Sequence, residues 1–513
     1  MKYLNKITIF FLSTIFVISS CNTDELTDLN INPNAVNEID MHLLLTQVQL
    51  LNNSPGYSFE KTWWYLPGYM QYMAATYGVL DFGDKYLNSR PEDLAGFYEN
   101  SYQNAVLNVN EIIEHTKDDP AQKGLYAVAR IMKVLVMHRL TDFYGDIPYS
   151  EAAKGFSEGI LQPKFDPQEG IYQDMLKELE ESVSIIKSGA SLTKPEQDIF
   201  YKGDMVKWSR FANSLMLRLG MRMSKVSPDG AKQWVAKAIS GGVMGSNDDN
   251  TVLLHANGPS DINWNPLSFL NTDPEVVGSK MSKTFIDWMK NNNDPRLMIF
   301  TMGIGPKGGP FDTDPAHQKG LPNGYDEITI RQYEGLPETQ DVDLDLTYSA
   351  INVLLVSRTS PSIYMTHAEV EFLLAEASQL GWISDDAAAH YNAGVTSALK
   401  QYAIYDSSFE VSDAEVQQYL EAHPYNQENG LEMIGEQYWA VNFTNPAEAW
   451  ANWRRTGFPV LKQIQYKLGS HDDKIPRRFQ YPLDEPSVNT KNYNEVVARQ
   501  GPDTWQTRIW WDK

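Results

Sequence analysis

One glycine-rich stretch has the spacing of a phosphate-binding turn. Gly303 to Gly309, GIGPKGG, matches G-x-G-x-x-G and follows the strand-like letters LMIFTM. A dinucleotide site needs a helix to begin at these glycines, so that the helix N-terminus meets the pyrophosphate. Pro306 and the following GGPFDTDP cannot continue as a helix. We therefore interpret the stretch as a loop and expect no nucleotide cofactor.

An acidic stretch could attract a metal ion. In DVDLDL, Asp341 to Leu346, carboxylates alternate in a way that calcium could use. An EF-hand loop needs Gly at its sixth position and Glu at its twelfth, and those positions hold Leu346 and Asn352. An acidic loop is the favoured interpretation, with bound calcium left open. The nine histidines show no metal-ligand spacing, and we interpret His138 and His367 as packing or capping residues.

Enzyme chemistry has no other signature in this sequence. The letters of a zinc-protease helix, a Walker A loop and a serine-hydrolase elbow do not occur. A glycosidase needs only two carboxylates at the right separation. The 66 acidic residues form many pairs whose separation the sequence does not reveal. A glycoside hydrolase therefore stays open as an alternative to a protein that only binds.

The single cysteine, Cys21, stands where an apolar N-terminal segment ends. Lys2 and Lys6 precede an apolar run from Ile7 to Ile18, which has the length of a secretory signal and is too short to span a membrane. The letters ISSC, ending at Cys21, resemble a bacterial lipobox. We expect residues 1–20 to be removed and the Cys21 thiol to be acylated, since two or more acyl chains anchor a protein stably. A plain signal peptide with a buried cysteine is the alternative.

The segment that follows the predicted signal has the composition of a tether. Residues 21–40 are polar and lack a helical pattern, as a tether would, and Asp24-Glu25 resembles signals that send lipoproteins to the outer cell surface.

Removal of residues 1–20 takes away two lysines, so the net charge falls from −23 to about −25. A chain this acidic repels nucleic-acid phosphates, so we expect no nucleic-acid partner. With Cys21 acylated, no thiol remains for a disulfide or a nucleophile.

Helical patterns fill much of the chain. Asp166, Pro167 and Glu169 predict a helix start with a capping box, and apolar residues then recur every fourth position at Ile171, Met175, Leu179 and Val183. A helix is also predicted within 203–224, with Trp208, Phe211, Leu215 and Leu219 inward and Lys207, Arg210 and Arg218 outside or flanking. Helix returns at Thr366, which forms a capping box with Glu369.

Between these helices the composition changes. Residues from about 241 to 360 are rich in Gly, Pro, Asn and Asp, with short apolar bursts, and predict loops and small strands. No linker divides the chain. We expect a mostly α fold with one domain over 41–513, in which a helical scaffold, mainly 41–240 and 361–400, carries a loop-rich insertion.

Six stretches in order resemble one family. They are LTDFYGDIPYSEA (140–152), KWSRFANSLMLRLGMR (207–222), NNNDPRL (291–297), HAEVEFLLAEASQLGW (367–382), WANWRRTGFP (450–459) and IPRRFQYPLDEPSVNTKNY (475–493). Together, behind a lipobox, they are similar to the SusD/RagB family of nutrient-binding outer-membrane lipoproteins, in its SusD-like branch. The matches span nearly the whole mature chain.

The resemblance implies fold, location and partner. It implies tetratricopeptide-like helical hairpins, with the loop-rich region shaping the ligand site. It also implies a lipid-anchored protein facing the cell exterior, which forms a lid on a SusC-like TonB-dependent transporter and captures oligosaccharide or peptide fragments for import. The rivals are a surface lipoprotein glycoside hydrolase of helical-toroid type and a purely structural lipoprotein.

The shared motifs themselves have structural interpretations. Gly145 and Pro148 suit a tight turn after a helix, with Asp142 and Asp146 available to cap backbone N–H groups. Four arginines are expected to fasten helices by stacking and by pairing with carboxylates: Arg454, Arg455, Arg477 and Arg478.

Ligand contacts can be nominated only by residue type and setting. Aromatic faces suit the C–H faces of sugars, so we nominate the aromatics of polar, loop-like stretches: Tyr77, Phe82, Tyr86, Trp264, Phe311 and Tyr325. Other aromatics recur at helical spacing and are expected in the core: Trp63, Trp64, Tyr69 and Tyr72.

Overall fold

A computed structural model describes residues 39–51, 59–87, 91–273, 276, 278–464, 466 and 474–513. Cys21 and the rest of the predicted signal and tether lie outside these residues, apart from the last two residues of the tether. One compact unit spans Met41–Lys513. Within the described residues, no helix has the length and apolar character needed to cross a membrane.

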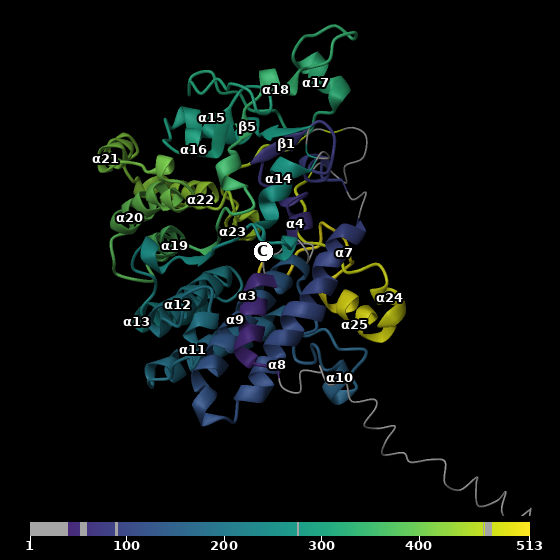
Figure 1. The fold of residues 1–513 in the computed structure, drawn as a ribbon, viewed down its shortest axis with the longest axis vertical. Coiled ribbons are helices and arrows are strands. Elements are labelled where there is room, and N and C mark those ends of the chain that lie inside the picture. The colour runs from purple at the N-terminus through teal and green to yellow at the C-terminus, as the bar shows by residue number, and fades with distance from the viewer. Residues whose placement is uncertain are drawn as a thin grey trace, which may run out of the picture. The chain divides into compact units, whose positions relative to one another are not determined.

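The fold is mostly α, as predicted. Its long helices are α3 (Met41–Leu51), α8 (Leu107–Thr116), α9 (Lys123–Tyr144), α11 (Gln168–Lys187), α12 (Met205–Arg222), α13 (Pro228–Gly241), α19 (His367–Gln379), α20 (Ala387–Lys400), α22 (Gly430–Val441) and α23 (Pro446–Thr456). Helices that follow one another in sequence pack together, notably α8 with α9, α11 with α12, α12 with α13 and α19 with α20. Figure 1 shows α8, α9, α11, α12 and α13 gathered at one end of this unit.

Shorter elements make up the rest of the unit, and several of them gather at its other end (Figure 1). The remaining helices are α4 (Phe59–Thr62), α5 (Leu66–Tyr69), α6 (Asp81–Asp84), α7 (Pro91–Asn100), α10 (Gly155–Glu158), α14 (Phe269–Thr272), α15 (Lys283–Asn291), α16 (Leu297–Phe300), α17 (Glu327–Tyr333), α18 (Leu344–Thr347), α21 (Asp413–Ala422), α24 (Glu485–Val488) and α25 (Thr490–Gln500). The strands are β1 (Met73–Ala75), β2 (Thr251–Leu253), β3 (Ser279–Met281), β4 (Thr301–Gly303), β5 (Ala350–Ile351) and β6 (Ser362–Met365). Elements α14–α18 and β2–β5 fall within 241–360, so this region contains short helices as well as the predicted loops and strands.

The loop-rich segment leaves the scaffold and returns to it at one place. Strand β2 pairs antiparallel with β6, with Thr251 opposite Met365 and Leu253 opposite Ser362. Residues 254–361 are therefore enclosed between two hydrogen-bonded strands, which we call the neck. Within the segment, β4 pairs antiparallel with β5. Strand β3 of the segment pairs antiparallel with β1, which lies outside it at Met73–Ala75 and so gives the segment a second hydrogen-bonded attachment.

Helix α11 shows where the sequence prediction holds and where it fails. Its predicted apolar stripe is buried throughout: Ile171, Met175, Leu179 and Val183. The predicted capping box is wrong, because the helix starts at Gln168 and Pro167 occupies the cap position. The Asp166 carboxylate instead accepts the backbone N–H of Ser150 at 2.7 Å. The Gln168 N–H is capped from a distant turn by Asp146 Oδ1 at 2.8 Å, as predicted for that residue.

Buried charges join three of the long helices. Arg218 donates to both Glu369 oxygens, at 2.6 and 2.8 Å, and Arg222 donates to both Glu448 oxygens at 2.7 Å. Burial would raise the pKa of Glu448, but Arg222 and Arg218 beside it prevail and lower that pKa to about 2. The prediction that Arg218 lies outside or flanking is wrong, since only 3% of its surface is exposed. Its partner comes from α19, which helical periodicity within α12 does not reveal.

The motif arginines fasten elements as predicted. The Arg454 guanidinium stacks 3.7 Å from the Trp450 ring centre. The other three pair with carboxylates, Arg455 with Glu376, Arg477 with Asp512 and Arg478 with Asp503. Asp142 accepts from the Trp511 indole N–H at 3.0 Å and from the Tyr172 hydroxyl, so the prediction that it caps backbone N–H groups is wrong.

The core is continuous and rich in aromatic rings. Trp63, Trp64, Tyr69 and Tyr72 are all buried, as predicted. Tyr72 stacks on Trp439 of α22 at 5.3 Å between ring centres and lies edge-on to Phe285 of α15 at 5.1 Å. Ring contacts of this kind join the loop-rich segment to the helical scaffold.

Candidate functional site

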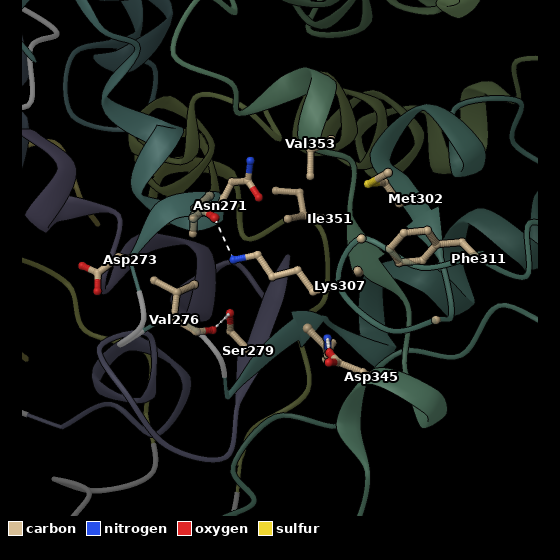
Figure 2. A pocket seen from close by; sticks show the side chains of 15 residues that line it. Asn271, Asp273, Val276, Ser279, Met302, Lys307, Phe311, Asp345, Ile351 and Val353 are labelled. Carbon is tan, nitrogen blue, oxygen red and sulfur yellow. Dashed lines mark hydrogen bonds and ion pairs between the residues drawn. The ribbon is translucent and has the colours of Figure 1, made fainter.

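A cavity of about 390 Å³ lies entirely within the loop-rich segment. Its walls come from α14, β3, β4, β5, the start of α18 and the loop after β4, and every described lining residue falls between 270 and 353. We call it the Phe311 cavity (Figure 2). Its volume is within the usual range for sites that bind small molecules.

Six side chains that line the Phe311 cavity are apolar. They are Leu270, Val276, Met302, Phe311, Ile351 and Val353. Phe311 supplies the one aromatic face among the described lining residues. Surfaces of this kind suit C–H and methyl groups of a ligand.

Polar groups lie among these apolar side chains. Figure 2 shows Lys307 reaching across the cavity, where its Nζ donates to the Asn271 carbonyl oxygen at 2.9 Å. At the rim, Lys280 forms an ion pair with Asp345. The Ser279 hydroxyl donates to the Val276 carbonyl oxygen at 2.7 Å. The cavity therefore combines apolar contact with groups that can fix the orientation of a polar ligand.

Glycines explain the shape of the loop that carries Lys307 and Phe311. Backbone hydrogen bonds between Ile304 and Asp312, at 3.1 and 2.8 Å, close it as a hairpin. Gly303 has a φ of +110°, and a Cβ there would meet the Asp312 carbonyl oxygen at 2.3 Å. The glycine pattern thus serves the tight return of the chain. The interpretation as a loop is confirmed.

A second, acidic cavity of about 260 Å³ adjoins the first. We call it the Tyr77 cavity, since the Tyr77 ring lines it and is 40% exposed. Its aspartates already have protein partners: Asp341 pairs with Arg331 at 3.5 Å, Asp343 caps α18, and Asp345 pairs with Lys280. Among the described residues, no group of three or more His, Asp or Glu side chains is placed to hold a metal ion.

A hydrogen-bonded wall supports the Tyr77 cavity. The carboxylate of Asp84, at the end of α6, accepts from the Asn323 side chain at 2.7 Å and from the Gly324 N–H at 3.1 Å. The neighbouring Lys85 donates to the Ala75 carbonyl oxygen of β1 at 2.7 Å. These bonds hold the chain that leads into α17, whose residue Glu327 lines the cavity.

Three of the six nominated aromatics lie in or beside these cavities. Phe311 and Tyr77 line the two cavities, which share Asp345. Tyr325 packs edge-on to Tyr333, with ring centres 5.1 Å apart, in a small apolar cluster that includes the cavity residue Ile330. Tyr325 thus lies behind the Tyr77 cavity.

The structure places the other three nominees elsewhere. Phe82 stacks on Tyr65 at 5.8 Å, and Tyr86 is a core residue with 1% of its surface exposed. Both belong to the packing around α5 and α6, so their stretch is less loop-like than the sequence indicates. Trp264 lies under the guanidinium of Arg358, 3.7 Å from the ring centre. None of the three lines the Phe311 or Tyr77 cavity.

Sequence reasoning missed most of the cavity lining. Met302, Ile351 and Val353 belong to the apolar bursts LMIFTM and INVLLV, which indicate strands but not a ligand. Lys307 lies in the glycine pattern that was weighed only for nucleotides. The one available signal is that both bursts flank loops of the same predicted insertion.

Comparisons with known proteins agree on one family. A SusD-like family model, described as starch-binding and associating with the outer membrane, matches residues 33–482. A solved chitin-binding protein is 34% identical, covering 92% of this chain and 100% of its own, with a TM-score of 0.81. A Bacteroidetes AC2a SusD-like structure is 28% identical, covering 93% and 100%, with a TM-score of 0.81. A SusD homologue from Bacteroides uniformis is 25% identical, covering 93% and 100%, with a TM-score of 0.71. No curated protein matches this chain.

Proposed function

Because the chain belongs to the SusD-like family of outer-membrane-associated binding proteins, we propose that it captures oligosaccharides and holds them in the Phe311 cavity. The family is one of binding proteins, not enzymes. The protein's task on this proposal is therefore to bind a nutrient and release it unchanged.

The observation that carries the proposal is the mixed apolar and polar lining of the Phe311 cavity. A sugar ring has apolar C–H faces and a polar edge of hydroxyl groups, so it needs both kinds of surface. Phe311, Met302 and Val353 supply the apolar contact, and Lys307, Asn271 and Asp345 supply donors and acceptors. Stacking on one aromatic ring contributes about 1 kcal/mol beyond area burial.

N-acetylated sugars fit this lining best. An acetamido group carries an apolar methyl group next to a polar amide, and six apolar side chains line the cavity together with Lys307 and Asn271. The 34% identical relative is a chitin-binding protein, and chitin is a polymer of N-acetylglucosamine. Unsubstituted glucans and peptides are the other ligand classes to compare.

The test is a calorimetric titration of the chain from Cys21 onward, made as Cys21→Ala. Oligomers of N-acetylglucosamine, maltooligosaccharides and peptides are compared. We expect the N-acetylated oligomers to bind most tightly and Phe311→Ala to weaken them about five-fold, the equivalent of one stacking contact. The matched control is Phe200→Ala, a half-buried ring against Trp208 of α12 that should leave affinity unchanged. Equal weakening by both variants, or no glycan binding, would contradict the proposal, as would release of a cleaved product.

The proposal also covers where the protein is anchored and which protein receives the captured glycan. We propose that acylated Cys21 anchors the protein in the outer membrane, facing the cell exterior, and that a SusC-like TonB-dependent transporter receives the captured glycan. In cells fed a fatty-acid label, the wild-type protein should be labelled and sediment with membranes, whereas Cys21→Ala should be unlabelled. Mild detergent extraction of the wild type should also retain the transporter. Labelling of Cys21→Ala, or a wild-type protein that purifies alone, would count against this part.

A further inference from the structure

A third cavity, of about 670 Å³, lies beside β4. One wall comes mainly from α16, β4 and the turn after β5, and the other comes from residues between Ser408 and Glu415, before and at the start of α21. We call it the Phe409 cavity. It lies between the loop-rich segment and the helical scaffold, and none of the nominated aromatics lines it.

The Phe409 cavity adjoins the Phe311 cavity. Met302 and Val353, two half-buried apolar side chains, line both cavities and so mark the boundary between them, which we call the ridge. Beyond the ridge, Leu354 is 40% exposed and extends the apolar surface into the Phe409 cavity. A chain-like ligand that leaves the Phe311 cavity over this ridge therefore stays in contact with protein.

The lining of the Phe409 cavity also combines apolar and polar groups. Its floor holds buried Ile299, Phe409 and Val411. Its rim holds exposed polar groups, among them Thr313 and the Glu410 carboxylate. A carboxylate accepts hydrogen bonds from adjacent sugar hydroxyls, and hydrogen bonds to a charged group are the stronger kind.

We infer that the Phe409 cavity is a second binding compartment, in which the oligosaccharide held in the Phe311 cavity continues past the ridge of Met302 and Val353. The inference rests on the proposed function. Sugar units joined by glycosidic bonds enter the second compartment without a second loss of translational freedom, so each added contact increases affinity directly. Affinity must then rise with chain length until both compartments are filled.

The experiment compares a disaccharide with a hexasaccharide of N-acetylglucosamine on three proteins. Wild type is compared with Leu354→Ala/Glu410→Ala, two exposed side chains that line only the Phe409 cavity. The matched control is Leu431→Ala/Glu428→Ala, an exposed pair of the same residue types outside all three cavities. All six affinities are measured by calorimetry, with unfolding curves to verify that each variant is folded.

We expect the hexasaccharide to bind wild type more tightly than the disaccharide. The Phe409-cavity variant should weaken the hexasaccharide roughly ten-fold, the scale of one lost charge-assisted hydrogen bond, and leave the disaccharide unchanged. Equal affinity of both sugars for wild type, or equal weakening of both by the variant, overturns the inference while the proposed function stands. Failure of both sugars to bind wild type overturns the proposed function as well.

Discussion

The pKa values of single side chains in this protein depend on contacts between neighbouring helices. On α20, the Nδ1 of His390 lies 2.7 Å from Glu371 of α19, whose other oxygen lies 3.0 Å from His367. The Nε2 of His390 lies 3.5 Å from Asp385. The hydrogen bond to Glu371 raises the pKa of His390 above its ordinary value. Against the effect of burial, the two histidines lower the pKa of Glu371 to about 2.

This cluster gives stability a defined pH dependence. A histidine whose pKa is raised on folding stabilises the protein fully below its unfolded pKa of about 6.5, and that stabilisation is lost as the pH rises through the folded value. We expect His390→Asn to destabilise the protein more at pH 5.5 than at pH 8.5, as measured by urea unfolding. In a Glu371→Gln background most of this difference between the two pH values should vanish. An effect of the same size at both pH values in wild type would refute the assignment.

Elements are joined by contacts that local sequence patterns specify only in part. The C-terminal end of α9 is hydrogen-bonded to α25. The Gln500 side chain accepts the Asp146 N–H at 2.7 Å and donates to the Tyr144 carbonyl oxygen at 3.1 Å, and we call this pair of bonds the clasp. Gly145 between them has a φ of +84°. A Cβ at this position would lie 1.9 Å from the Gln500 Oε1.

Gly145→Ala should therefore both strain the backbone and break the clasp. We expect a loss of stability of roughly 2–4 kcal/mol, since a strained φ costs about 1–3 kcal/mol and a displaced buried hydrogen-bonding group adds to it. The control is Gly189→Ala, where φ is +94° and nothing lies within 4 Å of the added Cβ, so only strain applies. Chemical unfolding of both variants measures the difference. Equal losses would show that the clasp contributes nothing.

The sequence predicts features that depend on local patterns, but not contacts between elements that are distant in the chain. Apolar periodicity located the stripe of α11, because each helix must bury one face. Periodicity misplaced Arg218, and the capping-box letters misplaced the cap of α11, because Glu369 and Asp146 come from other elements. Composition predicted the loop-rich segment. Of the nominated aromatics, only Phe311 lines the main cavity, since Met302 and Val353 have the pattern of ordinary strand residues.

At the scale of the whole molecule, one apolar core includes both the helical scaffold and the loop-rich segment. Phe285 of α15 lies 4.8 Å from Trp439 of α22, measured between ring centres. Strand β1 also pairs with β3 of the segment. The two parts are thus expected to lose structure together.

Unfolding should accordingly show one cooperative transition. Leu135→Ala in α9 and Phe285→Ala in α15 each remove a fully buried side chain, at a cost of about 2–5 kcal/mol. We expect each to lower the midpoint of the same transition, followed in parallel by far-ultraviolet circular dichroism and tryptophan fluorescence. A split into two transitions in either variant would show that the loop-rich segment unfolds by itself.

The neck of β2 and β6 has a consequence for how such proteins can diverge. Residues 254–361 leave and rejoin the scaffold at adjacent, hydrogen-bonded strands, so a change in the length of this segment need not displace any scaffold helix. Closing a longer loop costs little, about 0.6 kcal/mol for each doubling of its length. Insertions, deletions and recombination can therefore reshape the walls of the Phe311 cavity while the arginine–carboxylate pairs of the scaffold stay as they are. On the proposed function, new ligand specificities would arise by replacing one continuous stretch of the gene.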